Sequence, residues 1–300
     1  MLRKPNFLIV GAAKSGSTSL YQYLSQHPEV FMPVNKEPNY FVHEYQQKMN
    51  KECPSYSIDM NRMIFQKNEY YNLFKSAKTE HGAIGEATVT YLFKHSLAIQ
   101  NIKKELDNPK IIIILRNPIE RAFSQYAYAC ELGLENLNFK DAIEIENERL
   151  NSNWSSNFAY IGQGMFSNQV KAYLKNFDDV HILLLDDLKK NLQLEMNKIF
   201  NFLKISGDYK IQKTKKYNVS GIPKIRAVHD FLIHNNKTKI ILRKILPNYI
   251  LRNLSVFVRS VNQFQKLEIS LQDRNHLKNI YKKDIFELQK LIGRDLSNWI

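Results

Sequence analysis

The sequence is poor in the residues that disulfide-rich, zinc-binding or linker-containing proteins need. Its two cysteines, Cys53 and Cys130, are far apart and belong to no Cys-x-x-Cys pair or histidine cluster. We therefore predict neither a disulfide framework nor a zinc site, and we expect a reducing, cytoplasmic compartment. Only 9 prolines and 10 glycines occur among the 300 residues, without a low-complexity tract or a repeat. The prediction is a single domain over residues 1–300.

Long apolar runs are also absent. No stretch approaches the roughly 18 consecutive apolar residues of a membrane-spanning helix. A basic start, Leu2-Arg3-Lys4, precedes FLIVGAA as in a signal peptide, but this apolar part covers only about seven residues and leads into a glycine loop. We therefore predict no signal peptide and no membrane span. The 44% hydrophobic content suffices for one large α/β core.

Acidic residues are outnumbered, because 29 Asp and Glu face 43 Lys and Arg and give a net charge of +14. Such an excess indicates an anionic ligand, a nucleic acid or a membrane surface. Part of it lies in residues 224–254, whose helical pattern is apolar on one side and basic on the other, with Asp230 as the only acid. This basic side is either the solvated face of a packed helix or a surface for peripheral contact with a membrane.

The most informative stretch is residues 7–24, which read FLIVGAAKSGSTSLYQYL. The apolar run from residue 7 to residue 10 predicts a buried strand, and leucines at helical spacing after Gly16 predict a helix. Gly11 and Gly16 allow a tight turn, so the backbone amides of residues 15–19 can converge at the helix N-terminus. The stretch predicts an anion-binding loop, and the alternative is an ordinary strand–loop–helix unit of an α/β domain.

This loop matches the Walker A pattern only in part. Gly11 and Gly16 have the required separation, but Ser17 stands where the pattern has its lysine. The only lysine is Lys14, inside the loop, which disfavours triphosphate chemistry but can reach an oxygen that bridges two anionic groups. The predicted anion ligands are Lys14, Ser15, Gly16, Ser17, Thr18 and Ser19.

A candidate general base follows the next predicted strand, at residues 30–32. Lys36 and Glu37 come just past its end, and the carboxyl ends of parallel strands are where open α/β sheets bind their ligands. Pro38 fixes the backbone after Glu37, and the next two aromatic residues, Tyr40-Phe41, are expected to shield its carboxylate from water and raise its affinity for a proton. The alternative is a solvated loop glutamate.

A third motif is residues 110–129, which read KIIIILRNPIERAFSQYAYA. The aliphatic run predicts an interior parallel strand, and the Asn-Pro pair after it predicts a turn into a helix. Arg116 would emerge at the end of the strand, where it could hold a phosphate bidentately, with Ser124 on the following helix. Glu120 is expected on the helix surface. Arg121 fits either that surface or the binding side.

Two later segments carry possible binding groups. HILLLDDL at residues 181–188 predicts a strand that ends in two acids, Asp186 and Asp187. They could bind magnesium as in a Walker B motif, but caps of the next helix are the simpler interpretation without the loop lysine. The loop that carries Lys216 and Tyr217 could cap a nucleotide by charge and stacking.

The remaining segments indicate structure more than chemistry. Residues 44–80 are interpreted as a lid or a helical insertion. Two glycines within residues 160–164 predict a turn or a close backbone approach. The last 30 residues predict an amphipathic helix, after which Trp299 docks the tail.

Together these motifs resemble the sulfotransferases that use 3′-phosphoadenosine 5′-phosphosulfate (PAPS), in particular the carbohydrate-acting branch with the heparan sulfate enzymes and many bacterial relatives. AAKSGSTSL is similar to their 5′-phosphosulfate loop, and LRNPIERAFSQY is similar to their 3′-phosphate motif. The second similarity implies that Arg116 and Ser124 hold the 3′-phosphate. KEPNYF is similar to the segment with the catalytic glutamate, which implies this role for Glu37, and GEATVTYLF is similar to the segment that lines the acceptor cleft.

The resemblance implies a three-layer, P-loop-like α/β fold with a mainly parallel sheet and a C-terminal helical extension over residues 224–300. The implied reaction moves a sulfuryl group from PAPS to a hydroxyl or amine of a carbohydrate or glycolipid, without a metal. Lys14 would stabilise the bridging oxygen, and Glu37 would take the acceptor's proton. The alternatives are a magnesium-dependent P-loop kinase and a nucleic-acid-binding protein; the missing Walker lysine and the lack of a recognisable nucleic-acid module weigh against them.

Overall fold

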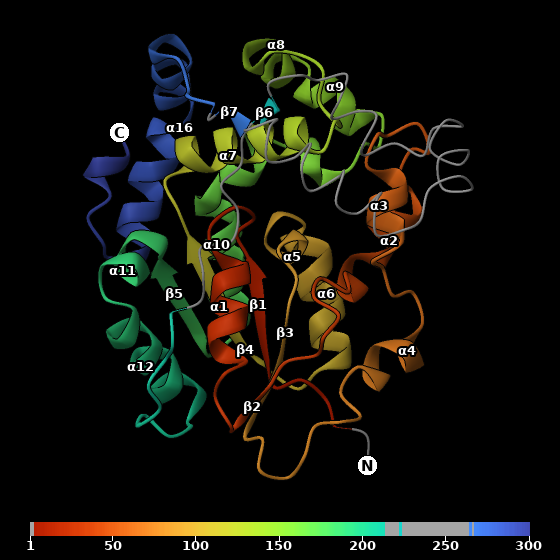
Figure 1. Ribbon diagram of the computed structural model, residues 1–300, viewed down its shortest axis with the longest axis vertical. Helices are drawn as coiled ribbons and strands as arrows, with labels where there is room; N and C mark the ends of the chain where they lie inside the picture. Colours follow the sequence, from red (N-terminus) through yellow and green to blue (C-terminus); the bar gives the residue numbers. More distant parts are fainter. Residues whose placement is uncertain (1–2, 214–221, 224–263, 266) are drawn as a thin grey trace, which may run out of the picture.

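The centre of the protein is a five-stranded sheet with the order β2-β3-β1-β4-β5, in which every neighbouring pair is parallel. The computed structural model describes residues 3–213, 222–223, 264–265 and 267–300 (Figure 1). The strands are β1 (Phe7–Gly11), β2 (Val30–Phe31), β3 (Ala83–Ala87), β4 (Lys110–Leu115) and β5 (Val180–Leu184). The predicted parallel sheet is therefore confirmed, with β1 between β3 and β4. Lys216, Tyr217 and the basic segment 224–254 lie outside the described residues.

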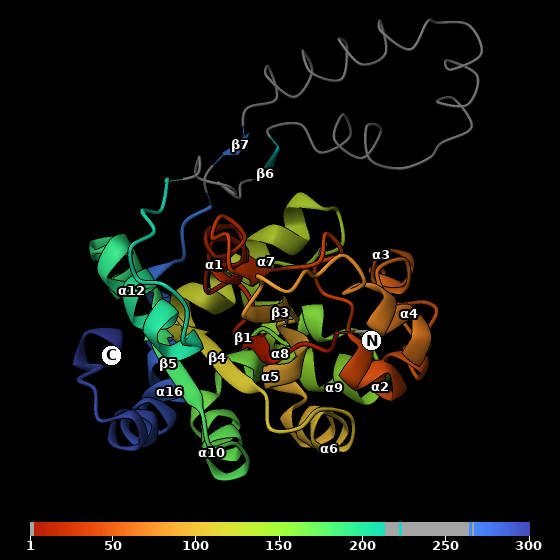
Figure 2. The same cartoon turned by 90° about the horizontal axis from the view of Figure 1, so that it is seen from below.

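Alternating side chains of β1 enter two separate hydrophobic cores, one on each face of the sheet. Phe7 and Ile9 join the core on one face, whereas Leu8 and Val10 join the core on the other. The first face is covered by α1 (Ser17–Leu24), α11 (Leu185–Lys190) and α12 (Leu192–Leu203). The second is covered by α5 (Thr90–Phe93), α6 (His95–Glu105), α7 (Pro118–Glu131), α10 (Phe166–Asn176) and α16 (Leu271–Ile292). Figure 2 shows helices on both sides of the sheet, which confirms the predicted three layers.

Shorter elements surround these layers. The predicted insertion at residues 44–80 consists of short helices, and Trp299 is only 2% exposed, as expected of a docked tail. The helices outside the main layers are α2 (His43–Gln47), α3 (Tyr56–Met60), α4 (Lys67–Asn72), α8 (Phe139–Glu144) and α9 (Glu146–Asn151). Single 3₁₀ turns occupy Tyr40–Val42, Ser156–Phe158, Gly162–Gly164 and Ser297–Trp299, and β6 (Ile222–Pro223) pairs antiparallel with β7 (Phe264–Gln265). Within the described residues, no helix is long and apolar enough to cross a membrane.

One of two charged residues of α7 lies where the sequence did not place it, and the other lies on the helix surface as expected. Arg121 is fully buried and donates a hydrogen bond to the carbonyl oxygen of Tyr160, so the expectation that it lies on the helix surface or the binding side is wrong. Glu120 is partly exposed but forms an ion pair of 2.6 Å with Arg274 of α16. Both side chains therefore connect α7 to distant segments, which no local pattern could indicate.

Gly85 of β3 provides a test of this packing. It lies opposite Phe7 in the β1–β3 pair, and a Cβ atom at residue 85 would lie 2.3 Å from the Phe7 ring. Because overpacking a filled core forces its neighbours to move, Gly85→Ala is expected to lower the free energy of unfolding by about 1–3 kcal/mol. Chemical denaturation measures this loss. Gly207→Ala, where the nearest atom is 3.9 Å away, is the matched control and should change stability by less than about 1 kcal/mol; equal losses in both variants would contradict the packing argument.

Candidate active site

The carboxyl ends of the strands surround a cleft of about 600 Å³. The loop after β1, the segment after β2, α7 and α11 all contribute to its walls. The sequence-predicted residues that line it are Lys14, Gly16, Ser17, Thr18, Ser19, Glu37, Arg116 and Ser124. Motifs that lie up to about a hundred residues apart in the chain thus converge on one cleft, as ligand sites of open α/β sheets do.

The loop between β1 and α1 has the shape of an anion-binding turn. Gly16 has a φ of 96°, and a Cβ atom there would lie 2.7 Å from the Leu185 side chain, so glycine is needed for both backbone and space. α1 begins directly after it at Ser17, with no side-chain cap on its N-terminus. The first amides of a helix have no partner within the helix and carry partial positive charge. Residues 16–19 therefore present amides and hydroxyls to the cleft.

Ser15 is the exception among the predicted loop ligands. Its side chain is fully buried and donates a hydrogen bond to the Ala13 carbonyl oxygen over 3.4 Å, while its backbone amide donates to Ala12 over 3.3 Å. It does not line the cleft. Ser15 thus stabilises the turn from inside, whereas the hydroxyls of Ser17, Thr18 and Ser19 belong to residues that line the cleft.

Lys14 lies in the wall of the cleft next to an aromatic ring. Its backbone has a φ of 60°, and its Nζ lies 3.9 Å from the centre of the Tyr128 ring, which attracts the cation. Burial lowers the pKa of Lys14 from 10.5 to about 8, an effect that the nearby Glu131 opposes. A left-handed conformation at a non-glycine residue is strained and is frequent at functional sites. Lys14 is therefore a partly desolvated cation held near the anion loop.

Arg116 and Ser124 lie together on another wall of the cleft. α7 begins with Pro118, and Asn117 caps it by accepting hydrogen bonds from the Ile119 and Glu120 amides, so Arg116 stays outside the helix at the end of β4. Its Nη1 donates to the Lys14 carbonyl oxygen over 3.1 Å, and its Nη2 lies 3.8 Å from Glu120. The guanidinium is thereby held beside the anion loop, with further N–H donors for an anion.

Glu37 faces the same cleft from the segment after β2. Its backbone has a φ of 63°, its amide donates to Ala87 of β3 over 3.0 Å, and its carbonyl oxygen accepts from Asn39 over 2.8 Å. The Glu37 carboxylate lies 2.5 Å from Lys36 Nζ and its side chain is 26% exposed. The predicted shield is wrong, because Tyr40 and Phe41 pack in the core, where the Tyr40 ring stacks on Tyr70.

Sequence reasoning missed several cleft residues. Arg62 comes from the insertion at residues 44–80, Gln125 from α7, Asn157 from the 3₁₀ turn after Ser155, and Lys189 from α11. Arg62 and Asn157 carry no local motif, so no sequence signal marks them. Lys189 comes shortly after the end of β5. Because β5 pairs in parallel with β4, residues after β5 are expected at the same edge of the sheet as Arg116, and this was the available sequence signal.

The segment GEATVTYLF contributes less to the cleft than expected. Val89 lines the cleft, whereas Glu86 is 1% exposed and accepts hydrogen bonds from Tyr70, Thr88 and Tyr91. Burial raises the pKa of Glu86 to about 7, and the charge of Glu37 acts in the same direction. Glu86 is therefore a buried support behind the cleft wall.

The two acids after β5 take part in ion pairs with basic side chains. Asp187 lies 2.6 Å from Arg294, and Asp186 lies 3.6 Å from Lys189. Both stand in the first turn of α11, where acids favour the helix dipole. The interpretation of the two acids as helix caps is wrong, because the N-cap is Leu184 and no side chain forms a cap hydrogen bond there. Among the described residues, no group of three or more His, Cys, Asp or Glu side chains is placed to hold a metal ion.

A parallel sheet whose first strand runs into a tight glycine-containing loop at a basic cleft defines a P-loop-like α/β fold. The model of the sulfotransferase domain family matches residues 4–231, so the chain belongs to this family. The resemblance stated from AAKSGSTSL and LRNPIERAFSQY is thereby confirmed, and the protein is a transferase.

Individual relatives agree with this assignment. The membrane-associated sulfotransferase kil1 of Dictyostelium discoideum is 33% identical over 131 residues, which make up 44% of this chain and 24% of that protein. Human bifunctional heparan sulfate N-deacetylase/N-sulfotransferase 2 is 26% identical over 221 residues, or 72% of this chain and 24% of that protein. The chain thus spans about a quarter of the length of these relatives. The crystal structure of a sulfotransferase from Alicyclobacillus acidocaldarius is similar with a TM-score of 0.75, 26% identity and 99% coverage of both chains.

Proposed function

We propose that this protein transfers a sulfuryl group from PAPS to a hydroxyl or amine of a carbohydrate or glycolipid, as one domain over residues 1–300. The observation that carries the proposal is the convergence of three groups on one cleft: the anion loop with Lys14, the pair Arg116 and Ser124, and the carboxylate of Glu37. Each group answers a separate need of the reaction. Family membership weighs against the kinase and the nucleic-acid-binding protein that the sequence left open.

The charge of the cleft fits a donor with phosphates at both ends. Its charged side chains are one carboxylate, Glu37, and the basic residues Lys14, Lys36, Arg62, Arg116 and Lys189. Lys14 and residues 16–19 would bind the 5′-phosphosulfate, and Arg116 with Ser124 would bind the 3′-phosphate. Lys216 and Tyr217, predicted to cap the nucleotide, lie outside the described residues and keep this role as a prediction.

The proposed chemistry is an in-line transfer in which one S–O bond breaks and one bond to sulfur forms. The acceptor oxygen or nitrogen attacks sulfur, its proton passes to the Glu37 carboxylate, and the bond from sulfur to the phosphate oxygen breaks. Lys14 and the loop amides stabilise the negative charge that develops on that oxygen. The bisphosphate leaves with both electrons of the broken bond. Fixed donors of the protein supply the stabilisation, so the proposal includes no metal.

The acceptor class and the location rest on the relatives. The human relative is named as a heparan sulfate N-sulfotransferase, which supports a carbohydrate acceptor with a hydroxyl or an amine. The Dictyostelium relative is named as membrane-associated, which supports peripheral membrane contact through residues 224–254 of an otherwise cytoplasmic protein.

Ligand-dependent stabilisation tests the donor without knowledge of the acceptor. Adenosine 3′,5′-bisphosphate, with phosphates for both ends of the cleft, is expected to bind more tightly than ATP, which lacks the 3′-phosphate. At about 100 times its dissociation constant a ligand adds roughly 2.7 kcal/mol to folding, enough to raise Tm by several degrees. Thermal unfolding should show this rise for the bisphosphate in the presence of EDTA, and a much smaller rise for ATP with magnesium.

Variants locate the effect in the cleft. Arg116→Ala should remove most of the stabilisation by the bisphosphate, because a charge-assisted contact is lost. Arg294→Ala, which removes a partly exposed arginine paired with Asp187, is the control and should keep it. Greater stabilisation by ATP with magnesium, or loss of the bisphosphate effect in EDTA, would replace the sulfotransferase proposal with that of a kinase.

A further inference from the structure

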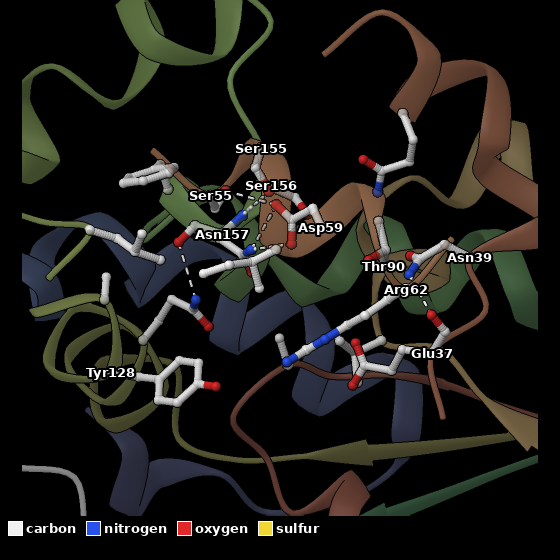
Figure 3. A pocket seen from close by; sticks show the side chains of 18 of the residues that line it. Glu37, Asn39, Ser55, Asp59, Arg62, Thr90, Tyr128, Ser155, Ser156 and Asn157 are labelled. Atoms are coloured by element: carbon white, nitrogen blue, oxygen red, sulfur yellow. Dashed lines mark hydrogen bonds between the residues drawn. The ribbon is translucent and has the colours of Figure 1, made fainter. Parts of the chain in front are cut away.

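The segment from Glu37 to Phe41, which we call the base segment, carries the proposed base in a strained backbone conformation. Glu37 has a φ of 63° and Asn39 has a φ of 54°, both in the left-handed region that non-glycine residues rarely adopt. The Asn39 side-chain amide donates to the Glu37 carbonyl oxygen over 2.8 Å and bridges the two residues (Figure 3). Such a conformation persists only where surrounding contacts hold it. The direction of the Glu37 carboxylate therefore depends on what anchors the base segment.

Two anchors of the base segment come from β3 and from α5, the short helix after it. The Glu37 amide donates to the carbonyl oxygen of Ala87 over 3.0 Å. The Phe41 amide donates to the Tyr91 hydroxyl over 3.3 Å. The Tyr91 side chain is fully buried, and the Tyr91 carbonyl oxygen accepts from the Tyr173 hydroxyl over 2.9 Å, so this anchor is itself fixed in the core.

Glu86 of β3 is bonded to the second anchor. It is 1% exposed, and its Oε1 accepts from the Tyr91 hydroxyl over 2.9 Å and from the Tyr70 hydroxyl over 3.3 Å. Its Oε2 accepts from the Thr88 hydroxyl over 2.8 Å, so its partners in the part of the chain that the structure describes are hydroxyl groups, not basic side chains. Burying a carboxylate without a cation is costly, and an apolar side chain would fill the same space at a lower cost. The carboxylate therefore does more than fill the core.

The carboxylate determines how the Tyr91 hydroxyl is used. A tyrosine hydroxyl has one hydrogen to donate and lone pairs that accept. Because an ionised carboxylate only accepts, Tyr91 donates its hydrogen to Glu86 and keeps its lone pairs for the Phe41 amide. Burial raises the pKa of Glu86, and the hydroxyl donors lower it, so these donors favour the ionised form. Glu86 thus controls an anchor of the base segment, although it does not line the cleft.

We propose that Glu86 is a positioning residue for the proposed base, acting through the Tyr91 hydroxyl on the Phe41 amide. The inference rests on the proposed sulfuryl transfer, because it names what holds the Glu37 carboxylate toward the acceptor in that reaction. Without the Tyr91 link the base segment gains freedom, and Glu37 spends less time in the direction that reaches the acceptor's proton. The expected result is a lower kcat with unchanged donor binding.

Two tyrosines provide a matched pair of variants. The rings of Tyr70 and Tyr91 are both fully buried, and both hydroxyls donate to the same oxygen of Glu86. Of the two, only the Tyr91 hydroxyl also accepts from the Phe41 amide. Tyr91→Phe and Tyr70→Phe therefore each remove one donor from the carboxylate, but only Tyr91→Phe removes the link to the base segment.

Hydrogen exchange of the backbone amides measures this link without an acceptor. In Tyr91→Phe the amides of residues 37–42 should exchange about tenfold faster, because the loss of one hydrogen bond makes local opening easier. In Tyr70→Phe their exchange should stay unchanged. The bond of 3.0 Å from the Ile64 amide to the Pro38 carbonyl oxygen does not involve Glu86, so the base segment should stay attached and open only locally. Equal exchange in the two variants would overturn the inference.

Turnover shows whether the link serves Glu37. The probe is radiolabelled PAPS with partially de-N-sulfated heparin, a polymer that offers both hydroxyls and amines. Tyr91→Phe should lower kcat about 10–100-fold and keep the Tm rise with adenosine 3′,5′-bisphosphate, whereas Tyr70→Phe should keep both. In the Glu37→Gln background, Tyr91→Phe should cause no further loss of kcat, because the base that it positions is already absent. A general structural defect would lower kcat by the same factor in both backgrounds.

Variants of Glu86 test the carboxylate itself. Glu86→Met has a similar length but no acceptor oxygen, so it should lower kcat as much as Tyr91→Phe does, and no further when the two are combined. Glu86→Gln keeps one acceptor oxygen for the Tyr91 hydroxyl and should recover most of the loss. Normal kcat in Glu86→Met, or equal losses in Glu86→Met and Glu86→Gln, would overturn the role of this side chain. If Glu86→Met does not fold, Glu86→Gln and the two tyrosine variants decide the question.

The outcomes separate this inference from the proposed function. If the bisphosphate fails to bind, or Glu37→Gln keeps its kcat, the proposed function falls and the inference falls with it. If both of those tests succeed but Tyr91→Phe and Tyr70→Phe behave alike, only the inference is overturned. If the unsubstituted protein transfers no sulfuryl group to the heparin probe, the carbohydrate acceptor is withdrawn from the proposed function, and hydrogen exchange in the two tyrosine variants decides the inference.

Discussion

Glu37→Gln is expected to lower kcat by about 10²–10⁴-fold, the usual cost of removing a positioned general base. Glutamine has nearly the same shape, but its amide cannot accept the proton that the acceptor loses. The backbone contacts of residue 37 with Ala87 and Asn39 do not involve the carboxylate and should persist. Donor binding, measured by the Tm rise with adenosine 3′,5′-bisphosphate, should therefore be kept.

The control for this substitution is Glu148→Gln, at an exposed position of α9. It carries the same chemical change outside the cleft and should leave both turnover and donor binding unaltered. Turnover of radiolabelled PAPS with saturating acceptor is the measurement. A Glu37→Gln enzyme with nearly normal kcat would remove Glu37 from the mechanism.

Lys14→Ala is expected to reduce both turnover and donor affinity, because the lysine would contact the donor in the ground state and in the transition state. The loss in kcat should be about 10²–10³-fold, as for removal of one group that stabilises developing charge. The matched control is Lys175→Ala at the exposed end of α10. If the Lys14→Ala and unsubstituted enzymes have equal kcat and equal donor affinity, Lys14 has no role in donor binding or in catalysis.

The pH dependence of kcat/KM provides a second test of Lys14. Burial lowers the pKa of Lys14 to about 8, so the ammonium form is present below that pH and is lost above it. Because kcat/KM reports the ionisation of the free enzyme, it should fall as the pH rises through about 8. Lys14→Arg keeps its charge over this range, so the fall should disappear from its profile. A fall that persists in Lys14→Arg would assign the ionisation to another group.

The sequence by itself determined which segments form strands of the sheet and where the predicted anion-binding loop lies along the chain. Apolar runs of strand length, leucines at helical spacing and the glycine pair around Lys14 are local patterns, and local physics decides them. The rule that parallel strands present their carboxyl ends at one edge then placed Glu37 and Arg116 near that loop. These inferences needed no knowledge of which distant side chains meet.

Only the tertiary structure decided which side chains point into the cleft. The Ser15 side chain is buried and bonds to Ala13, and Arg121 is buried against Tyr160. The Tyr40 ring packs in the core and does not shield Glu37. For Arg121 and Tyr40 the outcome depends on the packing of segments far apart in the sequence, and for Ser15 it depends on the exact turn of the loop. A periodic pattern contains neither kind of information.

The rest of the cleft wall depends on tertiary structure in the same way. Arg62, Gln125, Asn157 and Lys189 come from four separate segments, and each alone is an ordinary polar residue. The loop after β1, Glu37 and Arg116 were therefore predictable from local motifs, whereas these four side chains join the cleft only when the folded chain brings their segments together.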